Sequence, residues 1–163
     1  MRGEYSIGIA FQKLAWGIGQ PIFGAIAEKI GDRKAIVMGA LLYALGLVLS
    51  SYAVSPGAHQ ALSLLVGFGI AGTGFGVILA IVGRASSDEN RSMSLAIASA
   101  SGSGGQILGP PIAEALLASM PWQSVFLIFA VGILAVLFLM PFMRTPSPAS
   151  TAELEESMGA FFN

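Results

Sequence analysis

Three polar side chains share one face of the first long apolar segment of the chain. Lys13, Trp16 and Gln20 follow one another at i, i+3 and i+7, which is the spacing of one face of an α-helix. An ammonium group, an indole N–H and a carboxamide can together bind a negatively charged solute. Ionisable residues inside apolar helices are rare and often mark a solute pathway. We therefore predict that this stripe contacts a substrate; the alternative is that Lys13 extends its ammonium group to the nearer membrane surface.

A second polar face belongs to a later apolar segment. Its side chains recur at helical spacing and are Ser99, Ser103, Gln106, Pro110 and Glu114. Gln106 is a further candidate for substrate binding, and Glu114 is a candidate for carrying a coupling proton. Glu114 lies near the end of its segment, so the alternative is a carboxylate in water at the mouth of the site.

Several other chemistries lack the residues that they need. There is no cysteine, which excludes disulfides, thiolate metal sites and thiol catalysis. The single histidine, His59, lies between segments, so no segment offers the base that an intramembrane serine protease requires. Residues 67–72 read G-x-G-x-x-G, but they lie inside an apolar run with no preceding strand, which favours close helix packing over a dinucleotide site. We expect no enzyme, no metal and no cofactor.

The composition indicates that these segments lie in a membrane. Of 163 residues, 55% are hydrophobic and 10% are charged, whereas soluble domains carry about 25% charged residues. The net charge of -1 provides no basic surface for nucleic acid, so the expected environment is the lipid bilayer. The 21 glycines suit helices that pack by close backbone approach.

We expect an all-α polytopic bundle of five transmembrane helices. A bilayer core needs about 20 apolar residues in a helix. The segments that qualify are 7–27, 35–54, 61–82, 93–118 and 125–143. They are continuous apolar runs without the alternation of barrel strands.

The basic residues predict the orientation. Those that follow the first, third and fifth segments are Lys29, Arg33, Lys34, Arg84, Arg91 and Arg144, whereas only Arg2 lies outside the segments on the opposite side. Cytoplasmic loops carry an excess of Lys and Arg. The chain is therefore predicted to cross the plasma (inner) membrane with its N-terminus outside and its C-terminus in the cytoplasm.

The loop after the first segment carries glycines and charges at fixed spacing. They are Gly24, Glu28, Lys29, Gly31, Arg33 and Lys34. Gly24 would let another helix approach closely, and Gly31 is typical of a helix end. Glu28 lies at the negative end of its own helix dipole, so it should seek a positive partner elsewhere.

This set resembles the signature of major facilitator superfamily transporters between their second and third helices. The signature is glycine, three residues, an acid, a base, any residue, glycine, any residue and two bases, and every specified position matches. Glu28 resembles the acid of that signature, which in the family forms one half of a contact that keeps the inward gate closed. The resemblance therefore implies a gating role for the six residues; a solvated charged loop is the alternative.

Gly105, Gly109 and Pro110 resemble the first part of the family's fifth-helix pattern, Gly-x-x-x-Gly-Pro-x-x-Gly-Gly, which is often linked to antiporters. We assign these three residues to the same conformational machinery. Ala113 and Glu114 stand in place of the last two glycines, so symport and antiport both stay open. The prolines should also bend this helix.

The resemblance covers residues from about 5 to 150 and aligns them with helices two to six of the family. It predicts a partial N-terminal bundle over 1–144 and the start of a disordered cytoplasmic linker over 145–163. The expected function is secondary transport of a small solute by alternating access. An organic anion is suggested by the stripe and by a weak similarity of residues 12–21 to monocarboxylate and oxalate/formate carriers.

The alternative function is that of a non-transporting fragment or a membrane interaction protein. The family's first helix and its second half have no counterpart in this sequence. The expected partner is therefore a second half-domain or another copy of the chain. A second copy would meet the small-residue faces at 72–76 and 105–109.

Overall fold

The structure, a computed structural model, describes residues 2–142; Arg144 and the predicted linker at 145–163 lie outside the described residues. The described chain is helical, with short turns and no strand. Its elements are α1 (Arg2–Ile30), α2 (Asp32–Tyr52), α3 (Pro56–Thr73), α4 (Phe75–Ala85), α5 (Arg91–Ser119), α6 (Trp122–Val136) and the 3₁₀ helix η1 (Leu137–Phe142). The predicted all-α class is confirmed.

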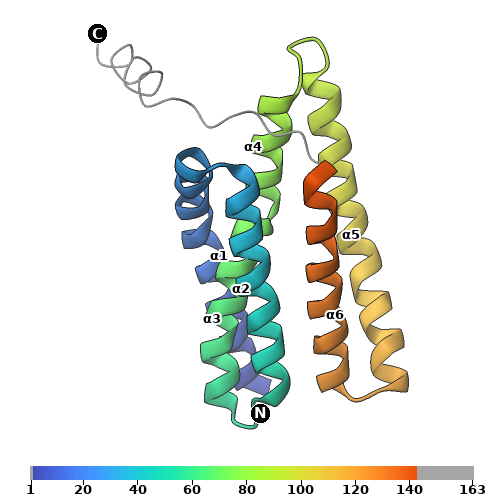
Figure 1. The fold of residues 1–163 in the computed structure, drawn as a ribbon. Helices are drawn as coiled ribbons and strands as arrows, with labels where there is room; N and C mark the ends of the chain where they lie inside the picture. The colour runs from blue at the N-terminus through green and yellow to red at the C-terminus, as the bar shows by residue number, and fades with distance from the viewer. Residues whose placement is uncertain (1, 143–163) are drawn as a thin grey trace.

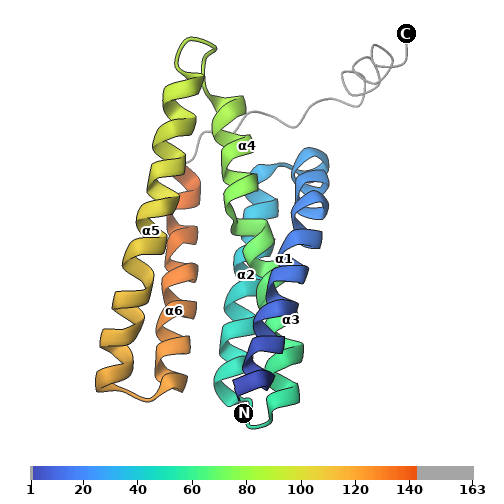
Figure 2. The same cartoon turned by 180° about the vertical axis from the view of Figure 1, so that it is seen from behind.

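The helices lie along one common axis, and successive spans run in alternating directions (Figures 1 and 2). The N-terminus, the α2–α3 turn and the α5–α6 turn lie at one end, which we call the N-terminal end. The α1–α2 turn and the α4–α5 loop lie at the other end, which we call the loop end. The basic residues on either side of those two turns therefore gather at the loop end, as the sequence predicts. Which end faces the cytoplasm stays a prediction.

The five predicted spans correspond to α1, α2, α3 with α4, α5, and α6 with η1. Within the described residues, three stretches are both long and apolar enough to cross a membrane, namely 32–52, 56–85 and 122–142. α1 and α5 have 29 residues each and are longer than a membrane span requires, but their sequences are less apolar than those of the three qualifying stretches. They are the two helices that carry the predicted polar faces.

Glycines bring α3 close to α1 and α2. A Cβ atom built on Gly39 of α2 would lie only 2.6 Å from the Cα of Gly72 in α3. A Cβ on Gly67 would collide with the backbone oxygen of Gln12 in α1, and one on Gly69 would collide with the backbone of Tyr43. The run at 67–72 is therefore a helix-packing surface, as predicted. Because Gly72 is covered by Gly39 and Phe23, it is not available to a second copy, and that part of the predicted dimer face is wrong.

The predicted close approach at Gly24 is absent from the described part of the chain. A Cβ there would meet nothing within 4 Å, and the same holds for Gly105 and Gly109. α5 packs against α4 and α6, and none of its residues is buried. The helix runs without interruption through Pro110, and it leaves its small-residue face open.

Two glycines end helices for different reasons. Gly31 separates α1 from α2 with φ of 96°, in the left-handed region that favours glycine, and its N–H donates to the carbonyl oxygen of Ala27 at 2.9 Å. The helix end predicted there is confirmed. Gly74 separates α3 from α4 with ψ of 175°, and a Cβ on it would lie 2.5 Å from the carbonyl oxygen of Ile70. This break inside the third span has no counterpart in the sequence prediction.

Candidate substrate-binding site

Trp16, in the middle of the predicted stripe on α1, lies against the break between α3 and α4, whereas Lys13 is exposed. The Nζ of Lys13 lies 5.2 Å from the ring centroid of Trp16, a distance at which an ammonium group is attracted to an indole face. The Nε1 of Trp16 points toward Gly74 and lies 3.2 Å from the position that a Cβ on Gly74 would occupy. That nitrogen is buried and has no hydrogen-bond partner in the described chain. Buried donors without a partner are rare in folded proteins, so this one needs an explanation.

Gln20 extends the same face by one turn. Its Oε1 lies 2.8 Å from the position that a Cβ on Gly76 would occupy, so the carboxamide packs closely against the start of α4. Gly76 belongs to the first turn of α4, which has no side-chain cap. The first N–H groups of an uncapped helix have no intrahelical partner. The structure therefore brings Trp16 and Gln20 to the start of a half-helix within the bundle.

A cavity of about 330 Å³ continues from Gln20 toward the loop end of the bundle. Pro21 and Gly24 of α1 line one side, and Val77 and Arg84 of α4 line the other. Gly24, which contacts no other helix, thus contributes open space. The cavity connects the polar face of α1 with the loop that carries the family signature.

Arg84, which lines the loop end of this cavity, forms an ion pair with Asp32. Arg84 donates to Asp32, whose side chain is only 5% exposed, whereas that of Arg84 is 42% exposed. The sequence analysis does not predict this pair, because the two residues are 52 positions apart. The one available signal was that an acid and a base end neighbouring spans on the same predicted side of the membrane. Arg91 donates through Nε to the carbonyl oxygen of Gly83 at 3.0 Å.

The charged residues of the predicted gating loop lie at the loop end. Glu28 and Lys29 occupy the last turns of α1, Arg33 and Lys34 occupy the first turn of α2, and all four are exposed. Glu28 forms no ion pair with any described residue, so its proposed partner would have to come from outside residues 2–142. The gating role of these residues stays a prediction.

The polar face of α5 is separate from that of α1. Gln106 and Glu114 are both exposed, and α5 does not pack against α1. The hydroxyl group of Ser103 donates to the carbonyl oxygen of Ser99, one turn earlier in the same helix, at 3.2 Å. The structure therefore groups Lys13, Trp16 and Gln20 and does not bring Gln106 to them.

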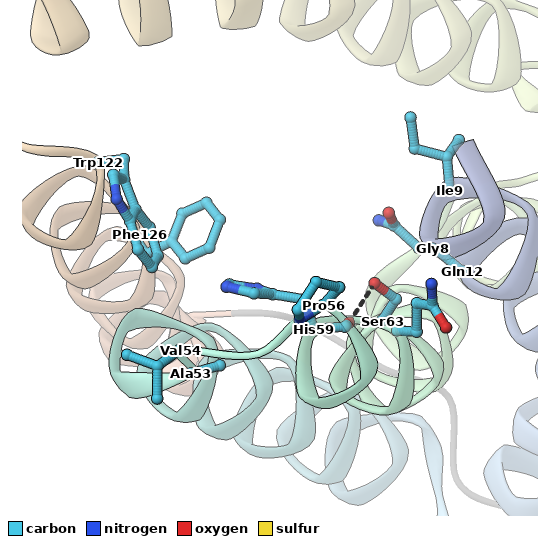
Figure 3. Close-up of a pocket in the computed structure, with 11 residues that line it drawn as sticks. Gly8, Ile9, Gln12, Ala53, Val54, Pro56, His59, Ser63, Trp122 and Phe126 are labelled. Atoms are coloured by element: carbon cyan, nitrogen blue, oxygen red, sulfur yellow. Dashed lines mark hydrogen bonds between the residues drawn. The ribbon is translucent and has the colours of Figure 1, made fainter. Parts of the chain in front are cut away.

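A second cavity lies at the N-terminal end and has a volume of about 530 Å³. Figure 3 shows α6 contributing Trp122 on one side and α1 contributing Gln12 on the other, with His59 between them. The His59 and Trp122 rings lie 5.4 Å apart, and the hydroxyl group of Ser63 donates to the carbonyl oxygen of His59 at 2.7 Å. His59, expected in a loop, thus belongs to the first turn of α3. Its cavity is lined mainly by apolar groups.

Apolar helices that run side by side, two of them with a polar face and one broken beside such a face, indicate a polytopic membrane protein and are typical of the transporter class. A comparison with family models gives the particular family. The model described as Major Facilitator Superfamily matches residues 3–162, and the chain belongs to that family. The resemblance drawn from the signature loop is confirmed.

Individual relatives agree with this assignment at low identity. The chain is 29% identical to the methyl viologen resistance protein SmvA of Salmonella typhimurium over 116 residues, which cover 71% of this chain and 23% of the relative. It is 33% identical to monocarboxylate transporter 13 of Rattus norvegicus over 124 residues, which cover 76% of this chain and 28% of the relative. It is 26% identical to the multidrug resistance protein MdtL of Escherichia coli over 166 aligned positions, which cover 98% of this chain and 42% of the relative. The chain thus spans less than half the length of these relatives.

Proposed function

We propose that this chain is the substrate-binding part of a secondary transporter that moves a small organic anion by alternating access. One observation carries the proposal: the polar face of α1 lies against the broken span at Gly74. Secondary transporters commonly bind solutes near the middle of the membrane, often where discontinuous helices present unpaired backbone groups. The partnerless N–H of Trp16 fits this interpretation, because a bound solute would accept its hydrogen bond.

The charge of the site favours an anion. Lys13 provides a positive charge, and the uncapped first turn of α4 adds the partial positive charge of a helix N-terminus. No acidic residue stands in the stripe to attract a cation. A carboxylate could bind Lys13 and the indole N–H of Trp16 together, with Gln20 binding a second polar group of the solute.

The relatives support two substrate classes. The name of monocarboxylate transporter 13 agrees with an organic anion. The names of SmvA and MdtL, which refer to methyl viologen resistance and multidrug resistance, favour toxic compounds as a second class of substrate. The two candidates are separable, because a site that depends on Lys13 should prefer carboxylates to cationic compounds.

The polar groups of α5 complete the proposal. Gln106 would contact the solute only if the solute or another helix bridged the space between α1 and α5. Glu114 would carry a coupling proton from its exposed place on α5. Both roles remain proposals, and neither is needed for anion binding by the α1 face.

Alternating access requires two helical bundles that rock around a shared site. We propose that a second half-domain or another copy of the chain provides the second bundle, and that Glu28 contacts it. The open face of α5 at Gly105 and Gly109 offers a surface for such a partner. A non-transporting interaction protein is the alternative. We place the chain in the cell membrane with its loop end in the cytoplasm, from the distribution of Lys and Arg.

Binding and transport should be measured on the same purified chain. Equilibrium dialysis should show saturable binding of labelled monocarboxylates and weaker binding of cationic compounds. Lys13→Ala should weaken carboxylate binding about tenfold or more, as expected for a lost charge-assisted hydrogen bond. Lys29→Ala, which removes a lysine outside the site, is the control. In proteoliposomes we expect binding without gradient-driven uptake as long as a single bundle is present; uptake by this chain alone would show that it is a complete carrier.

A further inference from the structure

A third cleft lies at the loop end of the bundle. It has a volume of about 650 Å³ and lies between the start of α2 and η1. Its lining combines two neighbouring cations with aliphatic side chains: Arg33, Lys34, Val37, Met38, Leu137 and Met140. None of these residues takes part in the proposed substrate site.

The cleft is divided into a charged part and an apolar part. Arg33 and Lys34 are exposed and belong to the first turn of α2, at the very end of the bundle. Val37 and Met38 come one turn further into the span, and Leu137 faces them from η1. In a membrane protein the ends of the helices lie at the depth of the lipid head groups, and the next turns lie at the depth of the acyl chains.

We propose that this cleft binds an anionic phospholipid. Its phosphate group would be held by Arg33 and Lys34, and an acyl chain would lie against Val37 and Leu137. Guanidinium and ammonium groups are the usual partners of phosphate oxygens, and basic pockets between transmembrane helices bind anionic head groups. A zwitterionic lipid would bring its own cation next to Lys34, and a soluble anion would gain nothing from the aliphatic walls.

The bound lipid would connect two parts of the fold that meet at this end. α2 begins at Asp32, which pairs with Arg84, and η1 continues α6. A lipid in the cleft would therefore bridge the start of the second span and the end of the last one, beside the signature loop.

The test measures lipid binding to the purified full chain by native mass spectrometry. Phosphatidylglycerol and phosphatidylcholine with identical acyl chains are the two lipids, and glycerol phosphate is the head group alone. We expect phosphatidylglycerol to bind more tightly, and Lys34→Gln to lower its affinity about fivefold without affecting phosphatidylcholine. Met38→Ser should weaken both lipids, because Met38 is exposed in the apolar part of the cleft. Lys29→Gln, in the same loop but outside the cleft, should leave both affinities unchanged.

Four results would overturn the proposal. The first is an unchanged phosphatidylglycerol affinity in Lys34→Gln, and the second is an equal loss in Lys29→Gln, which would indicate only a diffuse positive field. The third is displacement of the lipid by glycerol phosphate at equal concentration, which would indicate a site for soluble anions. The fourth is equal binding of phosphatidylglycerol and phosphatidylcholine to the unchanged chain, which would indicate that the charge of the head group is not recognised.

Discussion

Replacing Gly39 by alanine should push α2 away from α3. The new Cβ would lie 2.6 Å from the Cα of Gly72 and 3.0 Å from the backbone nitrogen of Thr73, whereas ordinary van der Waals contact begins at 3.4 Å. The helices would have to separate by about 0.8 Å, because backbone atoms cannot rotate out of the way as a side chain can. Overpacking of this kind costs about 1–3 kcal/mol, and we expect the upper part of that range for Gly39→Ala.

The assay is unfolding of the purified chain in mixed micelles by increasing SDS, followed by circular dichroism. Gly17→Ala is the matched control, since a Cβ on Gly17 meets nothing within 4 Å. The unfolding free energy of this control should exceed that of the unchanged chain by no more than about 0.5–1 kcal/mol, because alanine has a higher helix propensity than glycine. If Gly39→Ala proved as stable as Gly17→Ala, the close contact between α2 and α3 would be refuted.

Three other predictions concern charge, topology and the substrate site. Arg84→Ala should cost roughly 1–3 kcal/mol in the same unfolding assay, because it leaves the buried carboxylate of Asp32 unpaired while Arg84 itself is partly solvated; an unchanged stability would mean that the pair is unimportant. In intact cells, a membrane-impermeant maleimide should label a cysteine placed at His59 and should label one at Arg33 only after lysis; the opposite pattern would reverse the proposed orientation. Trp16→Phe should change the unfolding free energy by no more than about 1 kcal/mol, because it removes a donor with no partner. The same substitution should weaken carboxylate binding. Unchanged binding would mean that the indole N–H does not bind the solute.

The sequence predicts those features of the fold that depend on local patterns. Apolar run length locates the five spans, because each helix must match the bilayer core. Helical spacing places Lys13, Trp16 and Gln20 on one face. Gly31 ends α1 because its conformation needs no Cβ. Each of these depends on a single helix or a single turn. The structure agrees for the α1 face and for Gly31, whereas it divides the third span into α3 and α4.

Features that depend on contacts between helices were not predictable. The run from 61 to 82 is mostly apolar and has the length of one span, so the sequence predicts one helix, whereas α3 stops at Thr73. The break becomes intelligible only when Trp16 of α1 is seen against Gly74. The pairing of Asp32 with Arg84 likewise requires α2 and α4 to be neighbours. Gly24 shows the opposite error, since a glycine in a family signature suggested a close contact that is absent from residues 2–142.

Tryptophan fluorescence can show whether an organic anion binds beside Trp16. The chain contains two tryptophans, so Trp122→Phe leaves Trp16 as the only indole and keeps an aromatic ring beside His59. Titration of this variant with monocarboxylates should give a saturable fluorescence change, and adding Lys13→Gln should shift the midpoint at least tenfold upward. No saturable change, or the same midpoint with and without Lys13, would contradict the assignment of the α1 face as the substrate site.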